Sequence, residues 1–268
     1  METICKNCET QYSEVYNFCP NCSQKSALHR LTFHDILHEG IHYFTHADKG
    51  LFQLIRDLFF KRGLVAFEYI EGKRKKYFPP LNFFLLIAAV FVFVATQTEE
   101  TLPTNMLEAH PEISQMTDAV EKQQAIGVYE RKIKVSHFTT KYSNLMAMCS
   151  LPLTALVFWL FYKKAKYNYI EHLVTGMYML GFCILVYALL ILPICFVLNF
   201  EDYVETLLFF MLQFIYFAVF YYGFLRKTTK LQFAKALGVS FLNLLLWFIL
   251  SASMVRFYIV SGFGGLLE

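Results

Sequence analysis

Apolar residues gather in long blocks along this 268-residue chain, and the blocks predict membrane-spanning helices. A helix needs roughly 20 mostly apolar residues to cross a hydrocarbon core of about 30 Å. A soluble chain would instead scatter its apolar residues among polar ones at a period of about two or about 3.6. The predicted fold class is therefore an all-α integral membrane helical bundle of about five transmembrane helices. The five stretches are 79–97, 144–162, 173–198, 204–225 and 237–260.

The third stretch is long and contains Pro193, which predicts a kink or an early end of the helix. Between the first two stretches, the polar segment 98–143 is expected to lie outside the membrane. Its part from Ile113 to Lys134 has helix-forming residues with spaced apolar positions, which predicts a short extramembrane helix.

Two amphipathic stretches precede the first predicted span. One runs from Phe33 to Phe44 and the other from Leu51 to Phe60, each with its apolar residues at helical spacing. In the second stretch the charged residues are expected on or near the polar side; they are Arg56, Asp57, Lys61 and Arg62. Both are expected to be cytosolic helices that lie on the membrane surface or pack on the spans. The chain thus divides into a cysteine module at 1–26, an amphipathic region at 27–78 and a transmembrane bundle at 79–268.

Composition supports this division, because 56% of the residues are hydrophobic and only 17% are charged. Basic residues near the span ends predict the orientation. If all five stretches span, three basic groups share one side. The connection around 199–203 has acidic residues and no basic one. We therefore expect a cytosolic N-terminus and an external C-terminus. Four basic residues in the 98–143 loop run against this assignment. The three groups are Lys73, Arg74, Lys75 and Lys76; Lys163, Lys164 and Lys166; and Arg226, Lys227, Lys230 and Lys235.

The most specific motif is a pair of CxxC knuckles separated by ten residues, at zinc-ribbon spacing. Each knuckle can direct two thiolates at one metal, and two knuckles complete a tetrahedral site that suits Zn²⁺. So short a segment cannot build its own core, so metal binding would supply its folding free energy. The predicted ligands of this single structural zinc ion are Cys5, Cys8, Cys19 and Cys22.

An alternative to the zinc site is a pair of structural disulfides, which would also use the four cysteines. Disulfides need an oxidising compartment, and the predicted location is the cytosol. In addition, Glu9 and Ser23 follow the second cysteine of each knuckle, where glycine often stands. A four-sulfur site has no open position for water, so the zinc is expected to be structural and not catalytic.

A histidine-rich segment contains His38-Glu39-Gly40-Ile41-His42, which matches the HExxH pattern of zinc hydrolases. In that pattern His38 and His42 would bind the metal and Glu39 would act as general base. The alternative is a polar histidine face on an amphipathic helix. The third ligand is unassigned, with Glu68 and Glu71 as candidates, and Gly40 weakens the helix, so the polar face is favoured.

A run of basic residues, Lys73, Arg74, Lys75 and Lys76, lies directly before the first span. We call these four residues the collar. At the membrane surface they could contact anionic lipid, at about 1 kcal/mol for each basic residue. Because the run adjoins a span, membrane lipid is the expected partner and nucleic acid is not.

Several features together resemble an uncharacterised family of Bacteroidetes membrane proteins, of the domain of unknown function 3667 type. They are the CxxC pair, the histidine segment ending in Asp48-Lys49-Gly50, and the run from Tyr69 to Tyr77, which reads YIxGKRxxY. The likeness covers about the first 95 residues well. It implies a bacterial inner membrane, and it implies no mechanism because the family has no established activity.

Three functions are compatible with these patterns. The first is a non-enzymatic adaptor, sensor or regulator whose ribbon docks a cytosolic protein partner or self-associates. The second is a channel or transporter with a regulatory ribbon, although the spans hold few ionisable residues of the kind that such proteins use. The third is a membrane metallohydrolase using His38, Glu39 and His42. The sequence favours the first.

Overall fold

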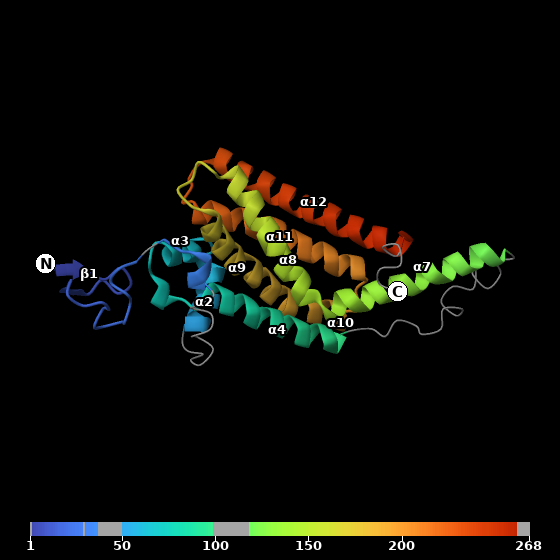
Figure 1. The fold of residues 1–268 in the computed structure, drawn as a ribbon, viewed down its shortest axis with the longest axis horizontal. Coiled ribbons are helices and arrows are strands. Elements are labelled where there is room, and N and C mark those ends of the chain that lie inside the picture. The colour runs from blue at the N-terminus through green and yellow to red at the C-terminus, as the bar shows by residue number, and fades with distance from the viewer. Residues whose placement is uncertain (1, 29, 37–49, 99–117, 262–268) are drawn as a thin grey trace.

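The computed structural model describes residues 2–28, 30–36, 50–98 and 118–261. Its strands and helices, in chain order, are β1 (Glu2–Ile4), β2 (Gln11–Ser13), α2 (Gly50–Phe60), α3 (Leu64–Ile70), η1 (Arg74–Lys76), α4 (Pro80–Thr98), α7 (Ala119–Lys141), α8 (Ser143–Phe161), α9 (Tyr169–Val186), η2 (Tyr187–Ile191), α10 (Leu192–Val197), α11 (Asp202–Phe224) and α12 (Lys230–Ser261). The long helices form an elongated bundle, with the strands beyond one end and α7 extending beyond the other (Figure 1).

Among the residues that the structure describes, four helical segments are long and apolar enough to cross a membrane, which supports the predicted membrane-protein class. They are Arg74–Gln97, Tyr169–Val197, Tyr203–Phe224 and Lys230–Val260. Each overlaps a predicted span. The remaining predicted span corresponds to α8, whose apolar part at Leu145–Phe161 is shorter than the other four. The fifth crossing stays a prediction.

The third predicted span differs from the expectation at both ends. It begins at Tyr169, four residues early, because Asn168 and Glu171 form a capping box that starts the helix there. Further along, the π-helical turn η2 directly precedes the turn that contains Pro193. Proline cannot donate a backbone hydrogen bond, and its ring crowds the preceding turn, so a wider turn relieves the clash. The helix thus does not end early at Pro193: it continues to Val197, with a π-helical turn before the proline.

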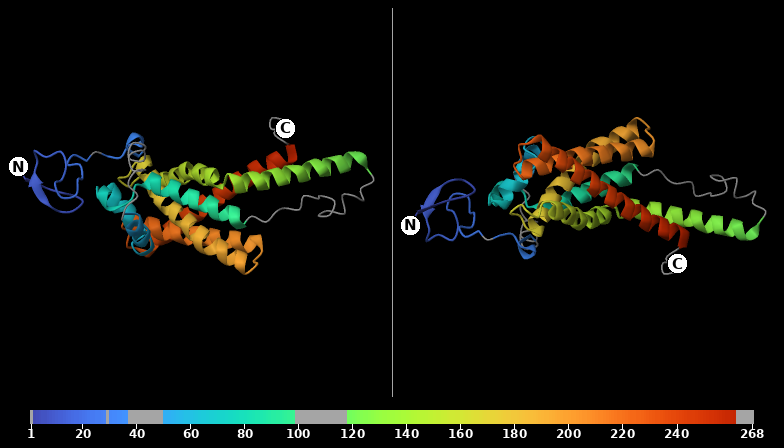
Figure 2. Two further views of the ribbon diagram at one scale, coloured as in Figure 1. Left: turned by 90° about the horizontal axis from the view of Figure 1, so that it is seen from below. Right: turned by 90° about the horizontal axis from the view of Figure 1, so that it is seen from above.

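Helix α9 forms the centre of the bundle and is buried without a break from Glu171 to Leu185. Helices α4, α8 and α11 surround it (Figure 2). Aromatic rings fill the space between α8 and α11, where Phe158 stacks on Tyr221 with ring centroids 3.7 Å apart. On the α4 side, the hydroxyl of Tyr178 donates a 2.7 Å hydrogen bond to the carbonyl of Phe78, directly before that helix.

Residues 50–78, which comprise α2, α3, η1 and the turns between them, pack as a unit across one end of the bundle. We call this unit the platform. Leu54 and Leu58 of α2 are fully buried, and the hydroxyl of Tyr216 on α11 donates a 2.9 Å hydrogen bond to the carbonyl of Leu58. Of the two arrangements expected for the amphipathic stretch at 51–60, the structure has it packed on the spans.

The helix predicted within Ile113–Lys134 is present as α7, shifted toward the C-terminus and extended to Lys141, and its extramembrane location stays a prediction. It joins the bundle at its far end, where the Nε of Arg131 donates a 2.8 Å hydrogen bond to the carbonyl of Ile259 on α12. The candidate hydrolase residues at positions 38, 39 and 42 lie outside the described residues.

Candidate metal centre

The four predicted cysteines converge on one point, with their sulfur atoms all within 4.8 Å of one another. The Sγ atoms of Cys5 and Cys22 are 3.6 Å apart, and those of Cys8 and Cys19 are also 3.6 Å apart. A tetrahedral zinc site with Zn–S bonds of about 2.3 Å requires sulfur atoms separated by about 3.8 Å. The cluster therefore has the spacing that a metal ion needs.

Each knuckle has the same backbone geometry. The N–H of Glu9 donates to the carbonyl of Cys5, and the N–H of Ser23 donates to the carbonyl of Cys19, both at 2.9 Å. Glu9 and Ser23 adopt left-handed φ angles of 62° and 57°. These are the positions where the sequence lacks the usual glycine, so both side chains accept a conformation that glycine adopts more readily.

The two partly exposed cysteines, Cys8 and Cys22, have different pKa values because their surroundings differ. Hydrogen bonds from the side chain and backbone of Thr10 lower the pKa of Cys8 to about 6. Burial raises the pKa of Cys22 to about 12. A bound cation removes this difference, because a coordinating thiol is deprotonated outright. The cluster offers four soft sulfur ligands and no free coordination position, which is the donor set of a structural site.

The cysteine module, 2–26, contacts the platform at Gly72. This glycine has a φ of +120°, and a Cβ there would lie 2.8 Å from the Leu28 side chain and 3.2 Å from the Lys6 side chain. Beside it, the N–H of Lys75 donates a 3.3 Å hydrogen bond to the Oε1 of Gln24, which is almost fully buried. The module therefore contacts the platform through side chains on both sides of its metal cluster.

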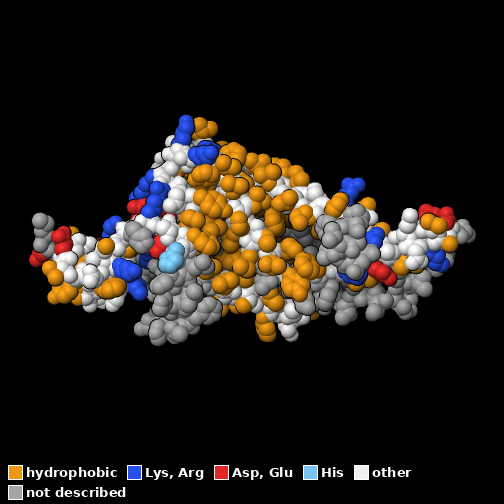
Figure 3. Space-filling model, viewed as in Figure 1, with side chains coloured by type: hydrophobic (Ala, Val, Ile, Leu, Met, Phe, Trp, Pro, Cys, Tyr) orange, Lys and Arg blue, Asp and Glu red, His pale blue; other side chains and the backbone are white. Residues whose placement is uncertain are grey.

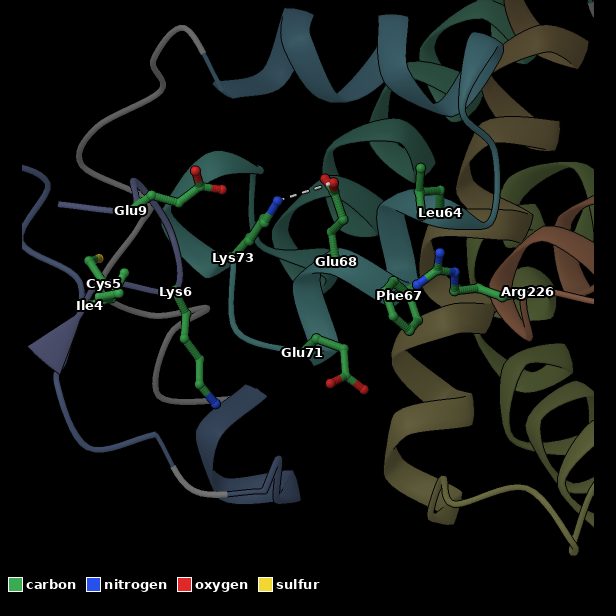
Figure 4. A pocket seen from close by; sticks show the side chains of 10 residues that line it. All are labelled: Ile4, Cys5, Lys6, Glu9, Leu64, Phe67, Glu68, Glu71, Lys73 and Arg226. Atoms are coloured by element: carbon green, nitrogen blue, oxygen red, sulfur yellow. Dashed lines mark hydrogen bonds and ion pairs between the residues drawn. The ribbon is translucent and has the colours of Figure 1, made fainter. Parts of the chain in front are cut away.

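A pocket of about 540 Å³ lies between the module and the platform (Figure 4). The side chains of Lys6 and Glu9 border it on the module side, and Glu68 and Lys73 form an ion pair across from them. At the far wall the guanidinium of Arg226 lies over the ring of Phe67, 5.1 Å from its centroid. The pocket has as many acidic as basic side chains, so it selects no single charge.

A second connection joins the segment after the module to the centre of the bundle. The Nε and Nη2 of Arg30 donate to the two carboxylate oxygens of Glu171 on α9, at 3.0 Å and 2.9 Å. Arg30 also donates to the carbonyl of Lys166. Two parallel hydrogen bonds from a guanidinium to a carboxylate fix orientation as well as position. We call the segment between the cysteine module and the platform the linker. The pair of Arg30 and Glu171 anchors the linker to the first turn of α9.

The platform contains a buried network of charged groups. The hydroxyl of Tyr77 lies 2.6 Å from the Oε2 of Glu68 and 3.2 Å from the Oδ2 of Asp57, and Tyr77 is only 2% exposed. Lys61 binds Asp57 at 2.8 Å, and Lys76 binds Glu68 at 2.5 Å. The Tyr77 hydroxyl is the donor in both contacts, which places it between the two carboxylates.

The collar takes part in this network. Lys73 and Lys76 both pair with Glu68, and the Lys75 backbone binds the cysteine module, so these residues have partners within the protein. Their predicted contact with anionic lipid is not tested by the structure and stays a prediction.

Sequence reasoning missed the residues that join the parts together. Asp57 was assigned to the polar side of its helix, but it is 1% exposed and faces the platform core. Its partner Lys61 stands four residues later, a spacing that could have indicated the pair. The capping box of Asn168 and Glu171 was also readable, whereas nothing local indicates that Arg30 reaches Glu171.

The fold and the cysteine cluster define a membrane protein with a candidate metal-binding module next to its first apolar helix. A model of the family described as "Protein of unknown function (DUF3667)" matches residues 48–92. The chain is similar to that family over this segment, which holds α2, α3, η1 and most of α4. No curated protein and no solved structure matches the chain. The matched segment includes the two carboxylates and the tyrosine of the platform network, Asp57, Glu68 and Tyr77.

Proposed function

We propose that this chain is a membrane adaptor or sensor, in which a zinc-stabilised cytosolic ribbon docks a protein partner and transmits its state to the helical bundle. The observation that carries the proposal is the attachment of the cysteine module to the platform at Gly72 and Lys75, within a few residues of the first membrane helix. A conformational change in the ribbon could therefore be transmitted through these contacts to the start of α4.

Zinc is the metal that best fits the donor set. Four cysteine sulfurs with tetrahedral spacing suit Zn²⁺, and a cytosolic location keeps the thiols reduced. All four positions are filled by protein, so the ion would stabilise the module and leave no position for a substrate. This chemistry favours a binding module over an enzyme.

The ribbon also exposes apolar side chains that a soluble surface usually buries. Val15, Tyr16 and Phe18, in the turn after β2, are 86%, 57% and 52% exposed, and Ile4 is 60% exposed. Exposed large apolar side chains gathered in one short turn, as at Val15, Tyr16 and Phe18, are typical of protein contact sites. They supply a surface on which a cytosolic partner could dock.

The partner is tested by photo-crosslinking in intact cells of the native host, with a photoreactive amino acid at Tyr16. A matched position at Asn21, exposed on the second knuckle, serves as control. We expect one discrete adduct from Tyr16, none from Asn21, and loss of the adduct when Cys5 and Cys8 are replaced by serine. Equal labelling from both positions would contradict a specific docking surface.

The coupling is tested by hydrogen exchange on the purified full chain, with and without a zinc chelator. We expect chelation to raise exchange across residues 2–26 and also around Gly72 to Tyr77. If the increase stopped at residue 26, the ribbon would be an independent module and the sensor proposal would fail.

A further inference from the structure

The end of the bundle that carries the platform also holds a second pocket, away from the ribbon. The C-terminal ends of α8 and α11 and the N-terminal end of α12 enclose about 420 Å³ there. Four lysines line it, and aromatic rings of Tyr162 and Tyr221 form part of its wall. The four are Lys163, Lys164, Lys227 and Lys235.

The pocket is strongly basic. No aspartate or glutamate lines it, and none of the four lysines forms an ion pair with a carboxylate of the described residues. The collar differs in this respect, since Lys73 and Lys76 are already paired with Glu68. Four ammonium groups without a counter-ion favour an anionic ligand.

Two of these ammonium groups are held in place by neutral partners. The Nζ of Lys235 donates a 2.9 Å hydrogen bond to the carbonyl of Phe161 and lies 4.7 Å from the ring centroid of Tyr162. The Nζ of Lys163 lies 5.0 Å from the ring centroid of Trp159. Carbonyl and ring contacts position a cation without neutralising its charge. The pocket therefore keeps its positive charge in an ordered arrangement.

Helix ends explain how the four lysines come together. Lysines near the C-terminal ends of α8 and α11 are favoured by the helix dipole, which accounts for Lys163, Lys164 and Lys227. Lys235 is in the second turn of α12, and its Nζ caps α8 through the carbonyl of Phe161, the last residue of that helix. The N-terminal end of α12 favours an anion bound in the pocket. Helix ends thus gather the four charges, and no carboxylate of the described residues lines the pocket to neutralise them.

The surroundings identify the source of the anion. Leu160 and Phe161 line the pocket and are each 46% exposed, continuous with the apolar surface of the bundle. In Figure 3 basic side chains gather at this end, directly beside the broad apolar band. A phospholipid has both a phosphate for the lysines and acyl chains for the apolar band, whereas a soluble phosphate compound has only the first.

We propose that the pocket formed by Lys163, Lys164, Lys227 and Lys235 binds the headgroup phosphate of an anionic phospholipid from the leaflet at this end of the bundle. The site lies apart from the collar and does not depend on the ribbon. It holds the ends of three helices around one headgroup, so lipid composition would set how tightly α8, α11 and α12 are held together.

The chain offers a built-in reporter for this site. Of its two tryptophans, Trp159 contacts Lys163 at the pocket, and Trp247 lies three turns further along α12 than Lys235. The full-length Trp247→Phe variant is reconstituted in phosphatidylcholine vesicles that contain brominated phosphatidylglycerol or, in parallel, brominated phosphatidylcholine. Bromine on acyl chains quenches tryptophan only at contact, so the ratio of the two quenching curves measures lipid preference at Trp159.

We expect brominated phosphatidylglycerol to quench Trp159 more than brominated phosphatidylcholine does. The double variant Lys164→Gln, Lys227→Gln should reduce this lipid preference by about fivefold for each lysine, because each charge contributes about 1 kcal/mol. Lys164→Arg with Lys227→Arg keeps the charge and should keep the preference. Lys132→Gln with Lys134→Gln removes two exposed basic residues on α7, outside both the pocket and the collar, and should leave it unchanged.

Three outcomes would overturn the proposal. The first is equal quenching by the two lipids, and the second is a preference that survives the double glutamine variant. The third is a soluble ligand, shown by inorganic phosphate raising the melting temperature of the lipid-free protein in detergent, with no lipid preference in vesicles. None of these outcomes bears on the ribbon, so the adaptor proposal is tested separately.

Discussion

The backbone of Gly63 lies directly against the carbonyl of Phe220 on α11, so that a Cβ at position 63 would sit 1.8 Å from that oxygen. Gly223, one turn later, faces the same glycine with its own Cβ position 3.6 Å from the Gly63 nitrogen. The two glycines allow the platform and the bundle to meet backbone to backbone. This contact positions α3 under the membrane helices.

Gly63→Ala should therefore separate the platform from α11. Neither backbone is a flexible side chain that could turn aside, and overpacking of a rigid contact costs on the order of 3 kcal/mol or more. We expect a marked loss of resistance to denaturation in detergent, read by circular dichroism. Gly238→Ala is the matched control, because nothing lies within 4 Å of its Cβ position and alanine favours a helix by about 1 kcal/mol.

Metal content is predicted to be one zinc ion per chain of purified protein, measured by elemental mass spectrometry. Replacing Cys5 and Cys8 by serine should remove it, whereas Cys149→Ser should not, since Cys149 stands apart from the cluster. Replacing His38 and His42 by alanine tests the hydrolase hypothesis in the same assay. A second metal lost with the histidines would support that hypothesis, and an unchanged content would remove its basis.

Tyr77→Phe should destabilise the platform by about 1.5–3 kcal/mol, because it removes a buried hydrogen bond to a charged group. Without the hydroxyl, Glu68 loses one of its donors while it remains mostly buried. The measurement is equilibrium unfolding of the full chain in detergent. Tyr203→Phe, at an exposed position on α11, should change the unfolding free energy by less than about 0.5 kcal/mol. Equal effects from both variants would argue against the network.

The free energy of unfolding should fall at acidic pH, because Asp57 and Glu68 become protonated there. Burial, the largest single effect, raises the pKa of each carboxyl. The hydrogen bonds and positive charges around each group together outweigh burial and lower both pKa values: Lys61, Arg56 and Tyr77 act on Asp57, and Lys76, Tyr77 and Lys73 act on Glu68. A carboxyl whose pKa is lower in the folded state stabilises the protein above its unfolded pKa, and that stability is lost as pH falls. The ordinary values of 3.8 and 4.5 place the start of the loss near pH 4.5.

The measurement for this acid dependence is the melting temperature of the full chain between neutral pH and pH 3. The double variant Asp57→Asn, Glu68→Gln should be less stable at neutral pH and should show a flatter pH profile. Glu201→Gln, at an exposed position outside the network, should reproduce the wild-type slope. A double variant with the wild-type slope would place the acid sensitivity elsewhere.

How far the sequence predicts this structure depends on the range of the interactions. The cysteine cluster follows from local spacing, because each CxxC turn brings its own two sulfurs together. The apolar helices follow from composition over about 20 residues. Asp57 was misassigned because its charge suggests exposure, and only the nearby Lys61 and Tyr77 make its burial tolerable.

Contacts between distant segments could not be predicted. Arg30 and Glu171 are separated by 141 residues, and no periodicity links them. The close approach at Gly63 depends on the backbone of α11, which a pattern of side chains does not describe. The histidine motif, by contrast, lies outside the described residues, so its interpretation rests on sequence alone.

The pairing of Arg30 with Glu171 has a consequence for how the chain is made. A ribosome adds about 5–20 residues per second, so Glu171 is synthesised roughly ten seconds after Arg30. During that interval the linker has no anchor, and the N-terminal module hangs from an unfinished protein. The pair can close only when the first turn of α9 has reached the platform end of its neighbours. The linker is therefore anchored only in a chain that has formed α9. In a chain whose synthesis stops before α9, the linker stays unattached to the bundle.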